Sequence, residues 1–368
     1  MRDLDVASGG PSRSVPALAE SQSQFADVRV TVLYRDRGNP VVKLAKSKVI
    51  YQALTGGDVL FGSGLKPAFQ SGADCIVHLH GVWSPMLHRA AGYARKQSLP
   101  YVISTRGMLA QWAMGHKALK KKIAWRLYQE GDLKGAAVLL VSSEFEREDV
   151  SALLPESTVV VIPNGCEERP AEVHAYVALP SDKSCRWALA MGRLHPVKGF
   201  AELIEAWAGL GSPDWRLAIA GPDEDGYRTR LEQLIGKHDL GDRVVMLGEV
   251  NDAQKWSLLD QCELFVAPSK TENFGMAIAE ALQSGTPVIT TTGTPWRELN
   301  TYDCGWWVGP GTDELRRVLK VATDMDVKVL GSMGTRGKFL ITEKYSWNQV
   351  AANTIALYQS ILFGDAVQ

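Results

Sequence analysis

Short runs of β-branched residues alternate with amphipathic helical stretches along most of this chain, and that alternation limits its possible folds more than any other feature. Clusters of Pro, Gly and polar residues separate the runs, as loops separate strands from helices. Repeated strand–helix units imply parallel sheets that are covered by helices on both faces. The alternation restarts after residue 165, so the sequence predicts an α/β protein with two Rossmann-like domains.

The expected strands of the first half are 28–34, 75–80, 101–105, 137–142 and 158–162. Those of the second half are 187–191, 216–220, 243–247, 264–267 and 287–291. The helices expected in the second half are 198–210, 227–238, 252–260 and 276–284, and a closing helix is expected at 347–363.

The length of 368 residues is about twice what one compact core usually holds, which also favours two domains. The turn sequence Pro163-Asn164-Gly165 marks the join. We therefore expect an N-terminal domain at 1–165, a C-terminal domain at 166–345, and a final helix at 346–368 that packs back toward the N-terminal domain.

Composition indicates a soluble globular protein of the cytoplasm. Hydrophobic residues make up 45% of the chain and charged residues 22%, and no apolar run is long enough to span a membrane. The first thirty residues lack the pattern of a signal peptide. The five cysteines are scattered without a CxxC pair, so they are expected to be reduced thiols.

Charge is distributed unevenly along the chain. Residues 1–165 have a balance of +6 and residues 166–368 a balance of −7, and no Asp or Glu occurs from Cys75 through Gln129. A basic half favours an anionic partner, such as a membrane surface or a pyrophosphate lipid, with chance clustering of charge on a solvated face as the alternative. Nucleic acid is the weaker alternative because aromatic stacking platforms are missing.

The segment 116–128 is both basic and amphipathic. Leu119, Ile123 and Leu127 recur at every fourth residue among lysines, and Trp125 is suited to an interface. This pattern predicts a helix that rests on anionic lipid. A helix that simply packs on the domain with a lysine-rich outer face remains the alternative.

The first candidate site follows the strand expected at 187–191. Gly192 allows close approach of a ligand to the backbone, and Arg193 and Lys198 place two cations near the start of the next helix. Fixed cations and helix-terminal N–H groups suit a diphosphate, and in open parallel sheets ligands bind beyond the carboxyl ends of strands. Two solvated cations on an ordinary loop are the alternative.

The second candidate site follows the strand expected at 264–267. Asn273, Phe274 and Gly275 are expected to form a first helical turn whose unpaired N–H groups hold an anion. Glu280 lies in an otherwise apolar stretch, which indicates a hydrogen-bonding role. Glu272 and Glu280 are spaced for two contacts along an extended ligand rather than for an acid–base pair sharing one bond. A helix-capping role for Glu272 is the alternative.

These residues together carry a family resemblance. Gly192-Arg193 with Lys198-Gly199, then Glu272-x7-Glu280, then Gly285-Thr286-Pro287-Val288, resemble the retaining glycosyltransferases of family 4, which have the GT-B fold. The likeness extends to Gly9-Gly10-Pro11 as a glycine-rich first loop and to Tyr345-Ser346-Trp347 at the start of the last helix. It implies two Rossmann-like domains that face each other across a deep cleft.

The resemblance assigns a role to each matching residue. Arg193 and Lys198 would bind the donor diphosphate and stabilise the leaving charge, and Glu272 would contact the sugar hydroxyls. The amides of Asn273, Phe274 and Gly275 would hold sugar and phosphate oxygens. Glu280 would bind the ribose, the loop around Val250 the base, and Gly10 would close over the phosphates. Front-face attack with retention would need no protein nucleophile.

Further polar residues follow the strands of the first half. His80 and Arg106 are candidates for the acceptor or sugar side, with a structural histidine and a surface cation as the alternatives. Asp223-Glu224-Asp225 superficially resembles a metal-binding triplet, but the GT-B architecture implies no metal and no other cofactor. The chain lacks a GxxxxGK[ST] loop, an HExxH helix and a GxGxxG turn.

The function expected is therefore transfer of a hexose from a UDP- or GDP-linked donor to a saccharide acceptor, perhaps lipid-linked, in surface polysaccharide synthesis. The enzyme would act in the cytoplasm or at the inner face of the cytoplasmic membrane. A nucleotide-sugar epimerase of the same fold is one alternative, and a non-catalytic nucleotide-sugar or glycan-binding protein is another.

Overall fold

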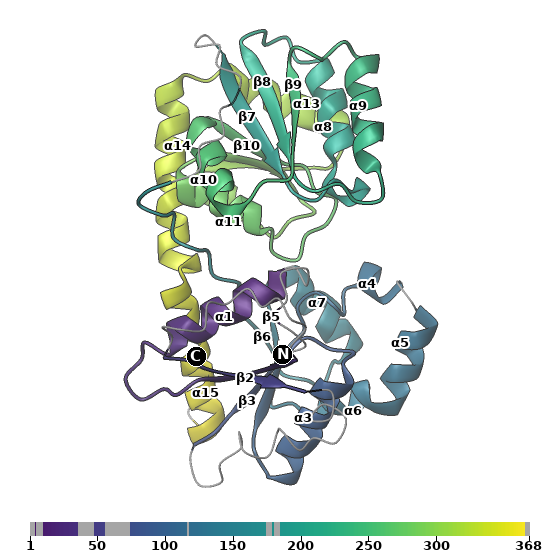
Figure 1. The fold of residues 1–368 in the computed structure, drawn as a ribbon, viewed down its shortest axis with the longest axis vertical. Coiled ribbons are helices and arrows are strands. Elements are labelled where there is room, and N and C mark those ends of the chain that lie inside the picture. The colour runs from purple at the N-terminus through teal and green to yellow at the C-terminus, as the bar shows by residue number, and fades with distance from the viewer. Residues whose placement is uncertain are drawn as a thin grey trace. The chain divides into compact units, whose positions relative to one another are not determined.

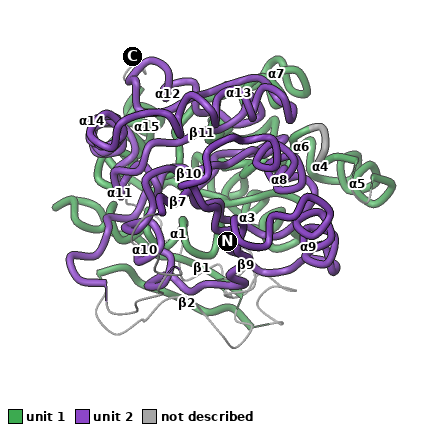
Figure 2. Tube along the Cα trace, turned by 90° about the horizontal axis from the view of Figure 1, so that it is seen from above, with its two compact units in different colours: residues 1–165, 347–368 green, residues 166–346 purple. Residues whose placement is uncertain are grey.

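A computed structural model of the chain describes residues 4, 10–35, 48–55, 74–115, 118–173, 179 and 185–364. The chain forms two compact units: Met1–Gly165 with Trp347–Gln368, and Cys166–Ser346 (Figures 1 and 2). The long last helix thus belongs to the same unit as the first half of the sequence. The five cysteines lie within the described residues, and all are free thiols.

Unit 1 is built on a parallel sheet in the order β3-β4-β5-β6. Its strands are β3 (Val77–His80), β4 (Tyr101–Ser104), β5 (Val138–Val141) and β6 (Val159–Val161). A separate parallel pair joins β1 (Thr31–Arg35) to β2 (Ile50–Leu54). The helices are α1 (Gly10–Gln22), α3 (Pro85–Lys96), α4 (Gln111–Gly115), α5 (Ala118–Ala124), α6 (Glu130–Lys134), α7 (Glu144–Leu153) and α15 (Trp347–Phe363).

Both faces of the four-stranded sheet pack against helices, as the apolar runs of β5 and β6 predict. Successive residues of β5 point to opposite faces: Leu139 packs with α3 and α7, whereas Leu140 packs with α1 and α15. The first strand pair was only partly predicted, because 28–34 was expected and Ile50–Leu54 was not. The charged stretch Asp3–Val6 lies outside the described residues except for Leu4, which is buried.

Unit 2 has a parallel sheet in the order β12-β11-β10-β7-β8-β9. Its strands are β7 (Arg186–Met191), β8 (Trp215–Ala220), β9 (Val244–Gly248), β10 (Leu264–Ala267), β11 (Val288–Thr291) and β12 (Gly305–Val308). Its helices are α8 (Phe200–Ala208), α9 (Tyr227–Lys237), α10 (Asp252–Gln261), α11 (Met276–Ser284), α12 (Glu298–Thr301), α13 (Thr312–Thr323) and α14 (Val327–Leu340).

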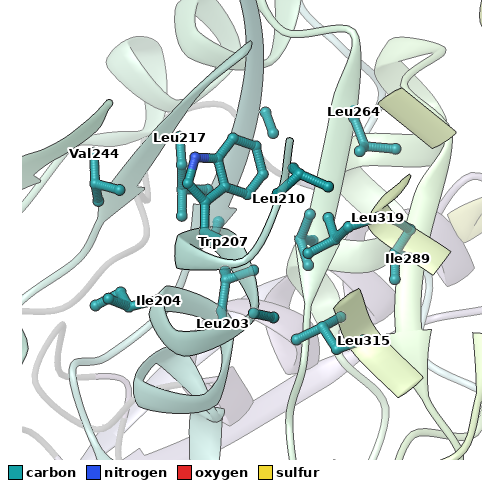
Figure 3. Close-up of a cluster of buried hydrophobic side chains, with 14 of the residues drawn as sticks. Leu203, Ile204, Trp207, Leu210, Leu217, Val244, Leu264, Ile289, Leu315 and Leu319 are labelled. Carbon is teal, nitrogen blue, oxygen red and sulfur yellow. The ribbon is translucent and has the colours of Figure 1, made fainter. Parts of the chain in front are cut away.

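In the core of unit 2, helix α8, which was predicted to start near residue 198, packs its apolar face against the sheet. Leu203, Ile204 and Trp207 of α8 are fully buried against strands β7, β8 and β10 and helix α13 (Figure 3). The opposite face is covered by α10 and α11. The five strands expected in this half are confirmed to within one residue at each end, and β12 was missed because Gly305-Trp306-Trp307-Val308 is short and follows a turn.

Candidate active site

The strand order of unit 2 fixes where a ligand can bind. From β7 the chain proceeds to β8 and β9 on one side, and then returns to place β10 on the other side of β7. Beyond the carboxyl ends of β7 and β10 the two connections therefore diverge, which is the usual ligand site of an open parallel sheet. Both segments singled out in the sequence, 191–199 and 269–281, follow these two strands.

The two loops are locked to each other through their backbones. Lys270 N donates to Val197 O over 2.8 Å. Gly199 has a φ of +72°, and a Cβ at this position would lie 2.1 Å from Pro268 O. This left-handed glycine separates a 3₁₀ turn, Pro196–Lys198, from α8. The helix therefore begins at Phe200 and not at Lys198 as predicted, because the helical conformation is broken at Gly199.

Lys198 and Glu272 form an ion pair at the meeting point of the loops. Lys198 Nζ donates to Glu272 Oε1, which also accepts from Ser269 Oγ at 3.0 Å. Each of the two charged side chains is only 19% exposed. A further bond, from Glu272 N to Gly293 O at 2.9 Å, fixes the backbone. The structure thus brings a predicted phosphate-binding cation against a predicted sugar-binding carboxylate.

Arg193 makes a more exposed ion pair, with Glu224. Glu224 follows β8 and belongs to the acidic triplet noted in the sequence, and Asp223 of that triplet accepts from Arg228 N. Within the described ranges, no group of three or more His, Cys, Asp or Glu side chains is arranged to hold a metal ion. Of the triplet, Glu224 serves as an ion-pair partner and Asp223 as an acceptor of a backbone hydrogen bond.

The loop that leads into α11 differs from the prediction. Asn273, Phe274 and Gly275 do not form the first turn of the helix, because Gly275 has a φ of +85° and acts as the N-cap of a helix that begins at Met276. Phe274 is buried, and its carbonyl accepts from Trp296 Nε1 at 2.5 Å. The Phe274 side chain is therefore part of the core, and the residue that anchors its carbonyl, Trp296, was missed by the sequence reasoning.

Glu280, on α11, is paired with Lys255 of α10. Lys255 Nζ lies 2.6 Å from Glu280 Oε1 and 3.5 Å from Asp252 Oδ1. Burial raises the pKa of Glu280, while Lys255 opposes that rise. Val250 lies one residue before Asn251, which caps α10 through a capping box with Gln254. Lys255 was also missed, since a helix-interior lysine gives no signal in a single sequence.

In unit 1 the structure brings His80 and Arg106 together. Arg106 follows β4 with a φ of +55°, and its Nη2 lies 3.1 Å from His80 Nδ1. Its Nη1 contacts Asn164 Oδ1 at 2.5 Å and Ser14 Oγ at 3.4 Å. Side chains from the end of β3, from the segment beyond β6 and from α1 thus meet at the Arg106 guanidinium group, as expected where parallel strands end at one edge.

The cluster of Arg106, His80 and the neighbouring His78 has one positive charge, on Arg106. Burial lowers the pKa of Arg106 to about 10, so it stays protonated at neutral pH. Burial likewise lowers the pKa of His78 to about 3, and that of His80 falls well below its usual value, so both imidazoles are neutral. Among the described residues no carboxylate forms an ion pair with Arg106, and its Nε has no hydrogen-bond partner.

Glu146 holds the strained loop that carries Arg106. Its buried carboxylate accepts from Gly107 N, from Thr105 Oγ1 at 2.5 Å, and from both the N and Oγ atoms of Ser142. Sequence reasoning missed Glu146 because it falls among the acidic residues of a surface helix.

Gly10 is the exposed first residue of α1, and Gly9 lies outside the described residues, so the role assigned to Gly10 stays a prediction.

Two α/β units, each built on a parallel sheet, are typical of the GT-B fold, and the family matches identify the class of protein. Residues 9–165 match the family model of the glycosyl transferase 4-like domain, and residues 178–325 match that of glycosyl transferases group 1. The chain belongs to this group 1, family-4-like class of glycosyltransferases.

Similar proteins support the assignment. The GDP-mannose:cellobiosyl-diphosphopolyprenol alpha-mannosyltransferase of Xanthomonas campestris is 26% identical over 98% of this chain and 96% of its own length. The gpi3 subunit of the phosphatidylinositol N-acetylglucosaminyltransferase of Schizosaccharomyces pombe is 29% identical over 78% of this chain and 61% of its own length.

Solved structures share the fold. Sucrose-phosphate synthase from Thermosynechococcus elongatus superimposes with a TM-score of 0.70 at 21% identity, covering 97% of this chain and 94% of its own. Anabaena HepE, in complex with UDP and glucose, gives a TM-score of 0.69 at 18% identity, covering 96% of this chain and 97% of its own.

None of the helices described for this chain has the length and apolar character needed to cross a membrane.

Proposed function

We propose that the protein transfers a hexose from a UDP- or GDP-linked donor to a saccharide carried by a lipid diphosphate, in the synthesis of a surface polysaccharide. The observation that carries this proposal is the Lys198–Glu272 pair at the carboxyl ends of β7 and β10. In a nucleotide sugar the phosphate adjoins the anomeric carbon. A phosphate-binding cation next to a sugar-binding carboxylate matches that junction.

Lys198 and Arg193 have defined tasks in this reaction. As the bond between the anomeric carbon and the phosphate oxygen breaks, negative charge grows on the nucleoside diphosphate, and both cations stabilise it. Donor binding then exchanges the carboxylate partners Glu272 and Glu224 for phosphate oxygens. Because two cations and the loop amides supply the positive charge, we expect the reaction to need no metal ion.

We further propose that the transfer retains the anomeric configuration, as the family resemblance implies. The acceptor hydroxyl attacks the anomeric carbon on the face that the phosphate leaves, and the leaving phosphate oxygen takes the hydroxyl proton. Glu272 holds the sugar hydroxyls during this step, and the backbone of Asn273–Gly275 holds sugar and phosphate oxygens. The anomeric configuration of the product, read by NMR, tests this part.

The acceptor side of the proposal rests on unit 1. Arg106 has a protonated guanidinium with no ion-pair partner among the described residues, and His80 adjoins it. A phosphate group of the acceptor would supply the missing negative charge. The relative from Xanthomonas campestris is named for a diphosphopolyprenol acceptor, which is the class of lipid that we propose here.

A basic ridge on unit 1 supports peripheral contact with an anionic membrane. Leu119, Ile123 and Leu127 are 74%, 53% and 76% exposed, which is unusual for three large apolar side chains on one helical face. Exposed Lys120, Lys122 and Arg126 border the ridge. In Figures 1 and 2, α5 lies at the edge of unit 1. Such a ridge suits the inner face of a cytoplasmic membrane, where lipid acceptors reside.

The deciding experiment measures transfer and binding together. The purified protein is titrated with UDP, GDP and ADP in a thermal-shift assay with and without EDTA, and then incubated with the matching nucleotide hexoses and a polyprenol-diphosphate oligosaccharide. We expect one nucleotide to stabilise the protein regardless of EDTA, and sugar to reach only the lipid acceptor. Conversion of the donor without acceptor would establish an epimerase instead, and binding without turnover a binding protein.

A further inference from the structure

The pairing of Lys255 with Glu280 is unusual for the place where it occurs. Lys255 lies inside α10, where its neighbours Trp256, Leu258 and Leu259 are buried core residues. The two paired side chains are 11% and 13% exposed, so both charges have been largely removed from water. A buried ion pair is often no more stabilising than well-packed apolar residues of the same volume. Stability alone therefore does not account for a lysine at this position.

The geometry divides the two oxygens of Glu280 between two roles. Lys255 Nζ binds Oε1 at 2.6 Å, whereas no hydrogen bond from another described residue reaches Oε2. Lys255 also stacks over the Trp256 ring at 4.9 Å, which limits its own movement. One oxygen is thus held by Lys255, while the other keeps its capacity to accept a hydrogen bond.

We infer that Lys255 is a positioning residue that holds Oε1 of Glu280 so that Oε2 accepts a hydrogen bond from a ribose hydroxyl of the nucleotide, and that it thereby sets the preference for ribonucleotides. This inference rests on the proposed donor site. It adds a residue that touches no ligand and acts only through the Glu280 carboxylate.

The positive charge of Lys255 favours the ionised form of Glu280, which is the better hydrogen-bond acceptor. A carboxylate accepts a stronger hydrogen bond from a hydroxyl than a neutral carboxyl does. Burial favours the neutral form of Glu280, and so do the negative charges of Glu167 and Asp252, whereas Lys255 favours the ionised form. The thiol of Cys166 also lies in this environment, and burial raises its pKa well above the usual value, so it carries no charge at neutral pH.

The test compares the affinities for a nucleoside diphosphate and for its 2′- and 3′-deoxy forms, using the nucleotide that the wild-type protein prefers. A ribose hydroxyl bonded to a carboxylate should give the wild type a preference of about tenfold over the corresponding deoxy form. In Lys255→Met we expect that preference to fall to about twofold, and Lys255→Arg to restore part of it. Arg186→Met removes a partly buried ion pair elsewhere in unit 2 and should leave the preference unchanged.

A pH series supplies a readout that loss of packing would not move. Without Lys255 the pKa of Glu280 rises further, so the preference for ribose should disappear on acidification at a higher pH than in the wild type. The ratio of ribo to deoxy affinities is used because the phosphate titration is common to both ligands. An unchanged pH profile in a folded Lys255→Met variant would overturn the inference.

A double variant covers the case in which Lys255→Met fails to fold. Lys255→Met/Glu280→Gln contains no unpaired buried charge, and it should match Glu280→Gln alone in its lost preference. Retention of the preference by Glu280→Gln would contradict the role of Glu280 and with it the inference. If the wild type bound no nucleotide at all, the proposed function itself would be wrong, which is a separate result.

Discussion

Lys198 and Glu272, 74 positions apart in the sequence, share a hydrogen bond from Nζ to Oε1 at the carboxyl edge of the sheet in unit 2. Both residues lie in loops that follow neighbouring strands, β7 and β10, and the loops are joined by the bond from Lys270 N to Val197 O. A cation and a carboxylate that are each four-fifths buried neutralise one another in the absence of ligand. In the proposed reaction, we expect the diphosphate to replace Glu272 as the partner of Lys198, and the sugar hydroxyls to replace Lys198 as the partner of Glu272.

Lys198→Ala should weaken nucleoside diphosphate binding more than Arg193→Ala does. Lys198 is largely buried, so a charged hydrogen bond to phosphate is worth about 1.5–3 kcal/mol, whereas the exposed Arg193 is screened by solvent. Calorimetric titration with UDP or GDP measures both. Arg317→Ala, on the exposed face of α13, is the control, and equal affinities for wild type and Lys198→Ala would refute the assignment.

Gly199→Ala should lower the free energy of unfolding and abolish donor binding together. The new Cβ would lie 2.1 Å from Pro268 O, and the left-handed φ of +72° adds strain of about 1–3 kcal/mol. Gly236→Ala is the matched control, because a Cβ on that helical glycine would have no neighbouring heavy atom within 4 Å. Urea unfolding of both variants decides the point, and a Gly199→Ala variant as stable as the wild type would contradict it.

Glu146→Ala should destabilise unit 1 by about 3 kcal/mol or more, because several buried donors would lose their acceptor. The loop bearing Arg106 should loosen as well, which would reduce the affinity for the lipid-linked acceptor. Chemical denaturation and acceptor kinetics measure the two effects. Glu144→Ala, on the same helix but exposed, should change neither quantity, and similar behaviour of the two variants would argue against this role.

Leu119→Ser/Ile123→Ser/Leu127→Ser should release the protein from vesicles that contain anionic lipid. These three exposed side chains offer apolar area to the bilayer, and the neighbouring lysines add attraction that salt weakens. Co-sedimentation with phosphatidylglycerol vesicles measures binding, and transfer to a water-soluble acceptor analogue should be unaffected. A wild-type protein that stays in the supernatant at low salt would show that the ridge serves another purpose.

His78 should make the protein less stable in acid. Its Nδ1 and Nε2 lie 2.5 Å from Tyr358 Oη and 2.7 Å from Ser104 Oγ, and burial lowers its pKa to about 3 from the usual 6.5. The unfolded chain therefore binds more protons between these two values, so stability falls as the pH drops below 6.5. The urea midpoint of His78→Gln should change less between pH 7 and pH 4.5 than that of the wild type.

Local sequence patterns determined most helices and strands. Leu203, Ile204 and Trp207 identify α8 because they recur at helical spacing, and the short apolar run 264–267 identifies the buried strand β10. The motif residues Arg193, Lys198, Glu272 and Glu280 are likewise recognisable in the sequence alone, because together they carry the resemblance to the family.

Tertiary structure alone decided which charges meet. Lys255 with Glu280, Arg193 with Glu224, and Glu146 under the Arg106 loop are contacts between residues 25 to 41 positions apart, and no local pattern encodes them. Backbone strain decided where α8 and α11 begin, at the left-handed glycines 199 and 275. The sequence by itself thus determined the fold class and the candidate ligand loops. Which charges pair in a low-dielectric interior depends on three-dimensional proximity, which only the folded chain supplies.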